Sequence, residues 1–359
     1  MTPKCATSLN VMQVLGTGSA LPGLPLTTEA VLARVATHLP AGAVPLAHRL
    51  ARRLGIETRH LARALDAPIE GTRPADSAPR LAALAVTRAL ADARLDPSAL
   101  HFLLGHTATP HTLLPSNTAW TADELGYGGP HAELRQACTG FAAGLLLADG
   151  LLATADRVVA IVGSETGSVF FDPRHIGEDH GQLVNLVQMG DGAGAVVLGR
   201  PTDAGASRIE LVYFGSDGLG RPPGLSIRGG GSGAPSATAG LPLFEHQYDA
   251  IRAQGLDLLR ASLTAAQNAG VDLATVQWFV PHQANGRMPE VCAQHLALPA
   301  DRVVCEATVV GNLGSAAIWV ALDRLRRSGR LSAGDRVLVL GAEATKYLYG
   351  GLLYVHGRS

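Results

Sequence analysis

Three short segments of the chain each place a reactive side chain in a predicted turn that contains glycine or alanine. Cys138 lies in Ala-Cys-Thr-Gly-Phe, His282 in Pro-His-Gln-Ala-Asn, and Asn312 in Val-Gly-Asn-Leu-Gly. A cysteine thiol can hold an acyl group as a thioester, and imidazole and carboxamide groups can donate hydrogen bonds to a developing enolate. Together the three side-chain types predict thioester-condensing chemistry, in which a malonyl group loses carbon dioxide.

Each segment also has an ordinary structural explanation when it is considered alone. A lone cysteine is more often a buried structural residue, and an asparagine beside glycines, such as Asn312, often marks only a turn with positive φ. Cys138 precedes an apolar helix that starts near Gly140, so we expect the helix dipole to favour the thiolate. His282 follows the strand-like Trp278–Val280, where ligand crevices commonly form. The combination of segments is therefore far more specific than any one of them.

The composition of the chain limits its class and its partners. The 359 residues are 47% hydrophobic and 16% charged, with a net charge of −1. This is enough for a large core in two domains or one two-lobed domain. Since no block of like charge is present, nucleic acid and anionic membranes are poor candidates as main partners. The N-terminus lacks a signal-peptide pattern, and four cysteines without a Cys-x-x-Cys pair indicate neither a disulfide framework nor zinc. We expect a cytoplasmic protein with a free thiol and no metal.

Short apolar runs alternate with helical patterns along the whole chain. Strands that alternate with helices predict an α/β fold whose sheets are covered on both faces. The later half repeats the rhythm of the first, which suggests an internal duplication, and we place the boundary to give halves 1–203 and 204–359. The expected strands are Val11–Gly16, Phe102–His106, Val158–Gly163, Ala193–Leu198, Ile209–Phe214, Trp278–Val280, Arg336–Leu340 and Leu352–Val355. The expected helices are Pro79–Ala93, Ser116–Leu125, Phe141–Thr154, Gln247–Asn268, Glu290–Leu296 and Ser315–Arg327.

With these motifs the chain resembles the β-ketoacyl-acyl-carrier-protein synthase III family of the thiolase superfamily over nearly its whole length. Besides the cysteine and histidine motifs, residues 15–22, Arg53–Arg59 and the Gly-Asp-Gly-Ala-Gly run at 190–194 are similar to family motifs, in family order. The resemblance implies a five-layered α/β/α/β/α fold from two duplicated halves. It also implies a homodimer that uses acyl-CoA and malonyl thioesters as substrates, with acyl carrier protein as a partner and without a cofactor.

The resemblance further implies roles for individual residues. Cys138 would be the acylated nucleophile, and His282 and Asn312 would stabilise the enolate. The backbone amides of Cys138 and Thr345 would form the oxyanion hole. Leu114 matches a position that reaches across the dimer to close the partner's acyl pocket. The residues expected at the pantetheine and nucleotide entrance are Arg53, Leu54, Asn285 and Arg287.

Departures from the family pattern predict a specialised member with an unusual starter acyl group. The housekeeping enzymes carry three glycines where this chain has Ala344–Lys346, so side chains crowd that loop, and we expect Lys346 to bring a charge near it. The segment Ser168–Met189 is longer than in those enzymes and is expected to change the acyl pocket or the dimer surface. Leu54 replaces an entrance threonine, and Arg135 replaces a small residue before the nucleophile, so both are expected to contact substrate.

Two alternatives to condensation stay open. An acyltransferase that moves the acyl group from Cys138 to an alcohol or amine would share the first half-reaction, although the retained His282 and Asn312 favour condensation. A non-catalytic chain-length partner subunit would typically lack the nucleophile, and an iodoacetamide-inert thiol would favour it. Thiolase activity needs a second cysteine in the terminal loop, and residues Gly341–Gly351 contain none.

Overall fold

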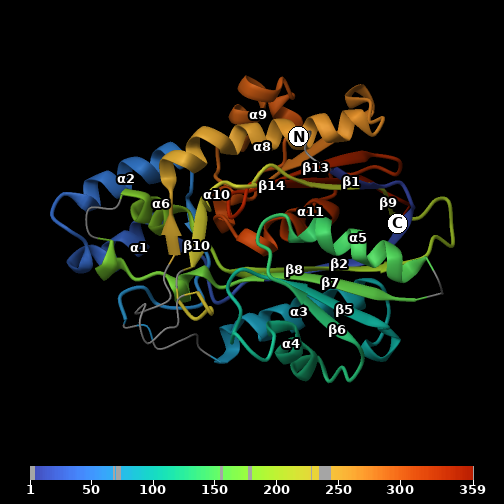
Figure 1. Ribbon diagram of the computed structural model, residues 1–359, viewed down its shortest axis with the longest axis horizontal. Coiled ribbons are helices and arrows are strands. Elements are labelled where there is room, and N and C mark those ends of the chain that lie inside the picture. Colours follow the sequence, from blue (N-terminus) through green and yellow to red (C-terminus); the bar gives the residue numbers. More distant parts are fainter. Residues whose placement is uncertain are drawn as a thin grey trace.

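The chain folds into five alternating layers of helices and sheets (Figure 1). The structure, a computed structural model, describes residues 5–67, 69, 74–153, 157–176, 180–227, 229–233 and 244–358. From one outer face to the other, the helical layers contain α8 (Tyr248–Asn268) and α9 (Met288–Leu296), then α5 (Gly140–Leu152) and α11 (Ala317–Arg327), then α3 (Ala78–Asp92) and α4 (Asn117–Leu125). In the described residues the strands between these layers form one continuous ten-stranded sheet, joined where Met12 and Gln13 pair with Ile209 and Arg208; its two layers are here called the two sheets.

Each sheet repeats the same pattern of strand pairing. One sheet contains, in spatial order, β6 (His131–Leu134), β5 (Phe102–His106), β7 (Val159–Glu165), β8 (Gly192–Gly199) and β2 (Met12–Ala20). The other contains β12 (Trp278–Pro281), β13 (Arg336–Glu343), β14 (Leu348–Val355) and β9 (Arg208–Ser216), with β1 (Cys5–Ser8) paired to β9. A parallel pair is followed by two antiparallel pairs in β5-β7-β8-β2 and again in β12-β13-β14-β9. This repetition is what an internal duplication produces, whereas the residue at which one half ends stays a prediction.

The layered arrangement explains why some strands and helices are buried on all faces. Strands β7 and β8 are buried along their whole length, because helices cover both faces of their sheet. Helix α5 packs between the two sheets beside α11, and the rings of Phe141 and Trp319 meet edge to face with centroids 6.0 Å apart. In the part of the chain that the structure describes, no helix is long and apolar enough to cross a membrane.

Each expected strand and helix is present, Phe102–His106 with the expected ends and the others with shifted ends; Thr154, one expected helix end, lies outside the described residues. Strand β2 extends to Ala20, beyond the expected Val11–Gly16, because Gly16 and Gly18 let it press against α3. A Cβ atom at Gly16 would lie 2.2 Å from the carbonyl oxygen of Ala89.

The elements that the sequence did not predict include, besides β1 and β6, α1 (Thr28–Val35), α2 (Ala43–Leu54), α6 (His180–Gln188), α10 (Ala307–Val310), β3 (Leu26–Thr27), β4 (Thr58–Arg59), β10 (Leu225–Ile227) and β11 (Phe244–His246). Short 3-10 helices are η1 (Ala36–His38), η2 (Pro74–Asp76), η3 (Pro97–Ala99), η4 (Gly167–Phe170), η5 (Pro173–His175), η6 (Leu273–Thr275), η7 (Ala300–Arg302) and η8 (Gly314–Ala316).

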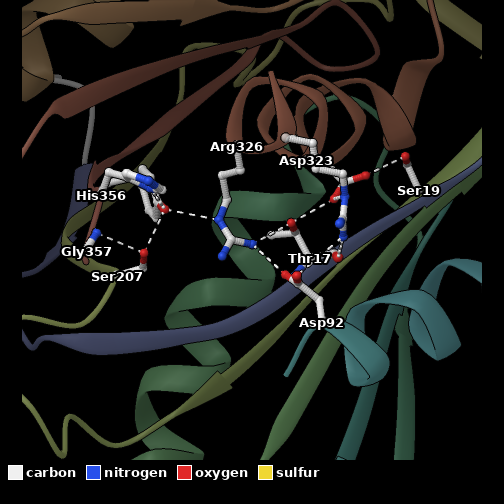
Figure 2. Close-up of polar contacts among 10 residues, drawn as sticks. Thr17, Ser19, Asp92, Ser207, Asp323, Arg326, His356 and Gly357 are labelled. Carbon is white, nitrogen blue, oxygen red and sulfur yellow. Dashed lines mark hydrogen bonds and ion pairs between the residues drawn. The ribbon is translucent and has the colours of Figure 1, made fainter. Parts of the chain in front are cut away.

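A polar network joins α11 to β2 and α3, which come from opposite ends of the chain (Figure 2). Asp323 on α11 is 3% exposed and accepts hydrogen bonds from Thr17 Oγ1 at 2.8 Å and Ser19 Oγ at 2.6 Å. Arg326 donates to Thr17 Oγ1 at 2.6 Å and to Asp92 Oδ2 at 2.9 Å. Because Asp323 satisfies buried donors on β2, its loss should destabilise the fold as a whole.

We expect Asp323→Ala to lower the free energy of unfolding by about 2–4 kcal/mol, because Thr17, Ser19 and Arg327 lose a buried acceptor. Urea unfolding followed by circular dichroism measures the loss. Asp96→Ala is the matched control, since Asp96 is exposed and its side chain forms no helix cap. An unfolding midpoint unchanged by Asp323→Ala would show that the network contributes nothing to stability.

Candidate active site

The structure brings the three motif residues to one cavity. Cys138 precedes α5, His282 follows β12, and Asn312 follows α10, yet all three line the same cavity of about 530 Å³. Catalytic groups from the ends of different elements commonly meet in this way in α/β folds. The cavity is therefore the candidate active site.

The start of α5 is held in place by a buried histidine. A Cβ atom on Gly140 would lie 2.4 Å from His106 Nδ1, so only glycine allows the helix to begin this close to the ring. His106 Nε2 accepts a hydrogen bond from Trp319 Nε1 at 3.1 Å, and burial lowers its pKa to about 4. A neutral imidazole thus supports the turn that carries Cys138.

The surroundings of Cys138 favour the protonated thiol. The residue is half-buried because part of its surface borders the cavity. Burial raises the pKa of its thiol well above the ordinary value, and the carboxylates of Glu343 and Glu165 raise it further. A helix terminus stabilises a charge by only about 0.3–1 kcal/mol, and one pKa unit corresponds to about 1.4 kcal/mol. Burial and two acidic neighbours therefore outweigh the helix dipole, which by itself favours the thiolate.

Glu343 links the turn after Cys138 to the loop Ala344–Lys346 by hydrogen bonds. It is 2% exposed, and its Oε2 accepts hydrogen bonds from the backbone N of Thr139 at 2.9 Å and from Thr139 Oγ1 at 2.7 Å. Its Oε1 accepts a hydrogen bond from Thr345 Oγ1. The prediction that Lys346 brings a charge to this loop is wrong, since Lys346 is exposed and its Nζ donates to the carbonyl oxygen of Arg221. At this end of the cavity the acidic side chain of Glu343 is in the lining, and Lys346 is not.

A second buried acid, Glu165, supports the turn after Asn312. Its Oε2 accepts hydrogen bonds from Ser315 N at 3.0 Å and Ser315 Oγ at 2.7 Å, and its Oε1 accepts one from Thr109 Oγ1. Burial raises the pKa of this carboxyl group. Sequence reasoning missed Glu165 and Glu343, although each ends an otherwise apolar strand, β7 or β13, where functional groups of α/β folds commonly lie.

His282 is a neutral imidazole in the cavity wall. Its backbone N donates to the carbonyl oxygen of Leu340 at 2.7 Å, which fixes it at the end of β12. Burial lowers its pKa to about 4, and its Nδ1 is buried without a hydrogen-bond partner. A buried N–H without a partner is rarer than a buried acceptor without one, so the proton belongs on Nε2. His282 can then donate one hydrogen bond from Nε2.

Asn312 is oriented as a hydrogen-bond donor. Its Oδ1 accepts a hydrogen bond from the backbone N of Gly314 at 3.0 Å, which leaves the Nδ2 protons for the cavity. Its own backbone N donates to the carbonyl oxygen of Gln188 at 2.7 Å. The positive φ angles of this turn belong to Gly311 and Gly314, so a left-handed conformation is not the reason for an asparagine here.

The four residues expected at the entrance all line the cavity: Arg53, Leu54, Asn285 and Arg287. Asn285 Oδ1 accepts a hydrogen bond from the backbone N of Arg287 at 2.8 Å. The Arg287 guanidinium donates to the carbonyl oxygen of Arg52 at 3.2 Å, next to Arg53. This rim of the cavity therefore carries positive charge.

Two other predicted substrate contacts lie outside the cavity lining. The guanidinium of Arg135 pairs with Glu133 at 3.1 Å. Leu114 is 88% exposed, away from the cavity of its own chain. Neither residue meets the catalytic trio within one chain, and their expected roles stay predictions.

Iodoacetamide is expected to label Cys138 slowly at neutral pH and faster as the pH rises above the ordinary thiol pKa, because only the thiolate reacts. Glu343→Gln removes one of the charges that raise this pKa, so the whole rate profile should move to lower pH. Labelling rates between about pH 6 and pH 10, with the modified cysteine identified by peptide mapping, measure the effect. A profile unchanged by Glu343→Gln would contradict the electrostatic role. Since slow labelling at neutral pH is the result expected of a catalytic thiol here, an inert thiol no longer identifies a non-catalytic subunit.

Comparisons with known proteins identify the family of the chain. The profile of the 3-oxoacyl-[acyl-carrier-protein (ACP)] synthase III family matches residues 132–218, and the profile of its C-terminal part matches residues 266–354. A β-ketoacyl-ACP synthase III of Streptomyces coelicolor is 35% identical over 297 residues, covering 80% of this chain and 82% of the relative. One of Desulfitobacterium hafniense is 32% identical over 342 residues, covering 91% of this chain and 93% of the relative.

Solved structures give the same result. A 3-oxoacyl-ACP synthase III of Pseudomonas aeruginosa PAO1 superposes with a TM-score of 0.80 and 27% identity, covering 97% of this chain and 99% of the other. A tetronic acid condensing enzyme superposes with a TM-score of 0.81 and 27% identity, covering 96% of this chain and 99% of the other. The chain therefore belongs to the β-ketoacyl-ACP synthase III family of the thiolase superfamily, and it is a condensing acyltransferase of the ketosynthase III type.

Proposed function

We propose that Cys138 carries the starter acyl group in a decarboxylative Claisen condensation. The observation that supports this most is the meeting of a thiol, an Nε2–H donor and an Nδ2 donor in one cavity. In the first half-reaction an acyl-CoA enters, its bond between carbonyl carbon and CoA sulfur breaks, and the same carbon bonds to Cys138 Sγ. The thiol proton leaves on the CoA sulfur.

The oxyanion hole would consist of the backbone amides of Cys138 and Thr345. Thr345 lines the cavity, and the bond from its hydroxyl group to Glu343 holds the loop beside the turn of the nucleophile. Since the donor is main chain, a loop of Ala344–Lys346 can replace glycines in this role.

In the second half-reaction a malonyl thioester loses carbon dioxide and its enolate attacks the acyl group on Cys138. His282 Nε2 and Asn312 Nδ2 would donate hydrogen bonds to the enolate oxygen in a site from which bulk water is excluded. Attack releases the Cys138 thiolate, which takes up one proton, and its raised pKa favours this return to the thiol. The products are a β-ketoacyl thioester and carbon dioxide, and the reaction needs no cofactor.

The positive rim supports recognition of thioesters with phosphate groups. Arg53 and Arg287 would contact the CoA phosphates, and Asn285 has a free Nδ2 for a pantetheine amide, because its Oδ1 is bonded to the Arg287 amide. Arg287 would also receive an acidic acyl carrier protein that delivers the malonyl group. We place the reaction in the cytoplasm, where free cysteines persist.

A homodimer would complete this site. Strand β6 is the edge of its sheet, and Leu113 and Leu114, in the loop that precedes α4, are exposed. A free edge and exposed leucines favour association of two copies, in which Leu114 would close the partner's acyl pocket. Sedimentation equilibrium should report two chains per particle, and a monomer at micromolar concentration would contradict the dimer.

Intact-mass analysis after incubation with a panel of acyl-CoAs tests the first half-reaction, and addition of malonyl-CoA or malonyl-carrier-protein tests the second. We expect an acyl adduct on Cys138 and then a β-ketoacyl thioester with release of carbon dioxide. No adduct with any acyl-CoA would overturn the assignment. An adduct that leaves only when an alcohol or amine is added would favour acyl transfer over condensation.

A further inference from the structure

Helix α6 supplies one wall of the active-site cavity, and that wall contains a buried carboxamide. Val184, Asn185 and Gln188 line the cavity from neighbouring positions on the helix. Asn185 is 6% exposed, and apolar side chains such as Leu225 and Phe244 lie in the same lining. Buried polar groups are normally fully paired, so the partners of this carboxamide define what the wall can bind.

A relay of hydrogen bonds, from the Phe244 carbonyl group through Gln182 to Asn185, determines which atom of the Asn185 carboxamide has no partner. Gln182 Nε2 donates to the backbone carbonyl oxygen of Phe244 at 2.7 Å. A carbonyl oxygen can only accept, so this bond places the Gln182 oxygen on the opposite side of its amide. The Gln182 oxygen also only accepts, and Asn185 Nδ2 donates to it at 3.3 Å. The orientation of both amides thus follows from a backbone group.

No described residue donates a hydrogen bond to Asn185 Oδ1, and this oxygen is not among the fully buried unpartnered atoms, so it borders open space where Asn185 lines the cavity. It is an acceptor with two lone pairs in a mainly apolar wall. Asn312 shows the opposite arrangement in the same cavity, because Gly314 binds its oxygen and leaves its nitrogen free. The cavity therefore offers donors beside the reacting carbon and an unpaired acceptor on the α6 wall.

We propose that Asn185 Oδ1 binds a hydroxyl group of the starter acyl chain, so that the protein selects hydroxyacyl thioesters over alkyl and ketoacyl thioesters. The inference rests on the proposed function, in which Cys138 receives the acyl group in this cavity. An alkyl chain would leave the buried acceptor unpaired, and a keto oxygen would face it with a second acceptor. A hydroxyl group satisfies it, and discrimination of this kind is strongest where a site is built to hydrogen-bond the substrate.

The test compares the rate at which Cys138 is loaded, by intact mass, from hexanoyl-CoA, its 3-, 4-, 5- and 6-hydroxy derivatives, and the oxo derivative at the preferred position. Scanning the hydroxyl position along the chain locates the atom that meets Asn185. We expect one hydroxy derivative to load about tenfold faster than hexanoyl-CoA, the factor expected for one buried hydrogen bond. The oxo derivative should load no faster than hexanoyl-CoA.

Asn185→Leu should abolish the hydroxyl preference while hexanoyl-CoA still loads, which also shows that the variant is folded. Gln182→Met releases the Asn185 amide to turn, so it should reduce the hydroxyl preference and improve loading of the oxo derivative. If Gln182 had a purely structural role, Gln182→Met would change neither the loading of the hydroxy derivative nor that of the oxo derivative relative to hexanoyl-CoA. Gln188→Leu is the matched control, because its carboxamide lines the cavity outside the relay, and it should keep the wild-type preference.

Loading of hexanoyl-CoA as fast as every hydroxy derivative would overturn the inference and leave the proposed function intact. Loss of the preference in Gln188→Leu but not in Asn185→Leu would also overturn it. If none of these thioesters loads Cys138, the proposed function fails and the inference fails with it.

Discussion

Replacing Cys138 with alanine is expected to abolish the covalent acyl adduct for every acyl-CoA that loads the wild-type protein. The thioester cannot form without the thiol, and the other cysteines lie outside the cavity lining. Intact mass spectrometry after incubation with acyl-CoA measures the adduct directly. Condensation should fall to the background rate, while decarboxylation of a malonyl thioester should persist because His282 and Asn312 are unchanged.

Cys5→Ala is the matched control for Cys138→Ala. Cys5 lies exposed on β1, so its replacement should leave both loading and condensation at the wild-type rate. A stoichiometric adduct in Cys138→Ala would show that another residue is the acyl carrier. Loss of the adduct in Cys5→Ala would contradict the assignment equally.

Asn312→Ala is expected to slow decarboxylation of the malonyl thioester by roughly 10²–10³-fold, the effect of removing one preorganised donor to a developing oxyanion. Loading of Cys138 should change little, since Asn312 acts on the second substrate. Release of labelled carbon dioxide from malonyl-CoA measures the step without the need for condensation.

Asn312→Asp distinguishes the effect of losing the hydrogen-bond donor from the effect of disturbing the turn. An aspartate can still accept the hydrogen bond from the Gly314 amide, but it presents no donor to the enolate, so its rate should be as low as that of the alanine variant. Asn285→Ala removes a carboxamide from the entrance of the same cavity, and it should raise KM with little loss of kcat. Full decarboxylation in Asn312→Ala would refute the enolate role.

The sequence was sufficient for the parts of the site that local pattern determines. The turns around Cys138, His282 and Asn312 follow apolar strands or precede an apolar helix, and such short-range signals place functional groups at sheet edges. The strands were predictable because continuous apolar runs are typical of strands buried on both faces.

Helix α6 was missed because its apolar residues are few and spaced among polar ones. Leu183, Leu186 and Val187 are buried together with residues of α2, and this short amphipathic stripe is interrupted by carboxamides that face the cavity instead. Residues Val184, Asn185, Gln188 and Met189 of this region line the cavity, whereas the expectation that the length of Ser168–Met189 changes the acyl pocket stays a prediction.

The protonation state of the thiol was beyond the reach of sequence reasoning. It depends first on burial of the thiol and then on Glu343 and Glu165, which are distant from Cys138 along the chain and approach it only through the packing of the fold. Nor does composition decide which of the nearby charges Glu343 and Lys346 faces the interior. Strand β13 ends at Glu343, and the turn that follows takes Lys346 to the surface.

The network of Figure 2 has a consequence for inheritance. Thr17, Ser19 and Asp92 come from the first part of the chain, and Asp323 and Arg326 come from the last. If recombination replaced only the last part of the chain by that of a relative, the hydroxyl groups of β2 would face side chains of the relative in place of Asp323 and Arg326. A substitution on either side would therefore leave hydrogen-bonding groups of the other side without partners, so the effects of substitutions in the two parts of the chain on stability are coupled.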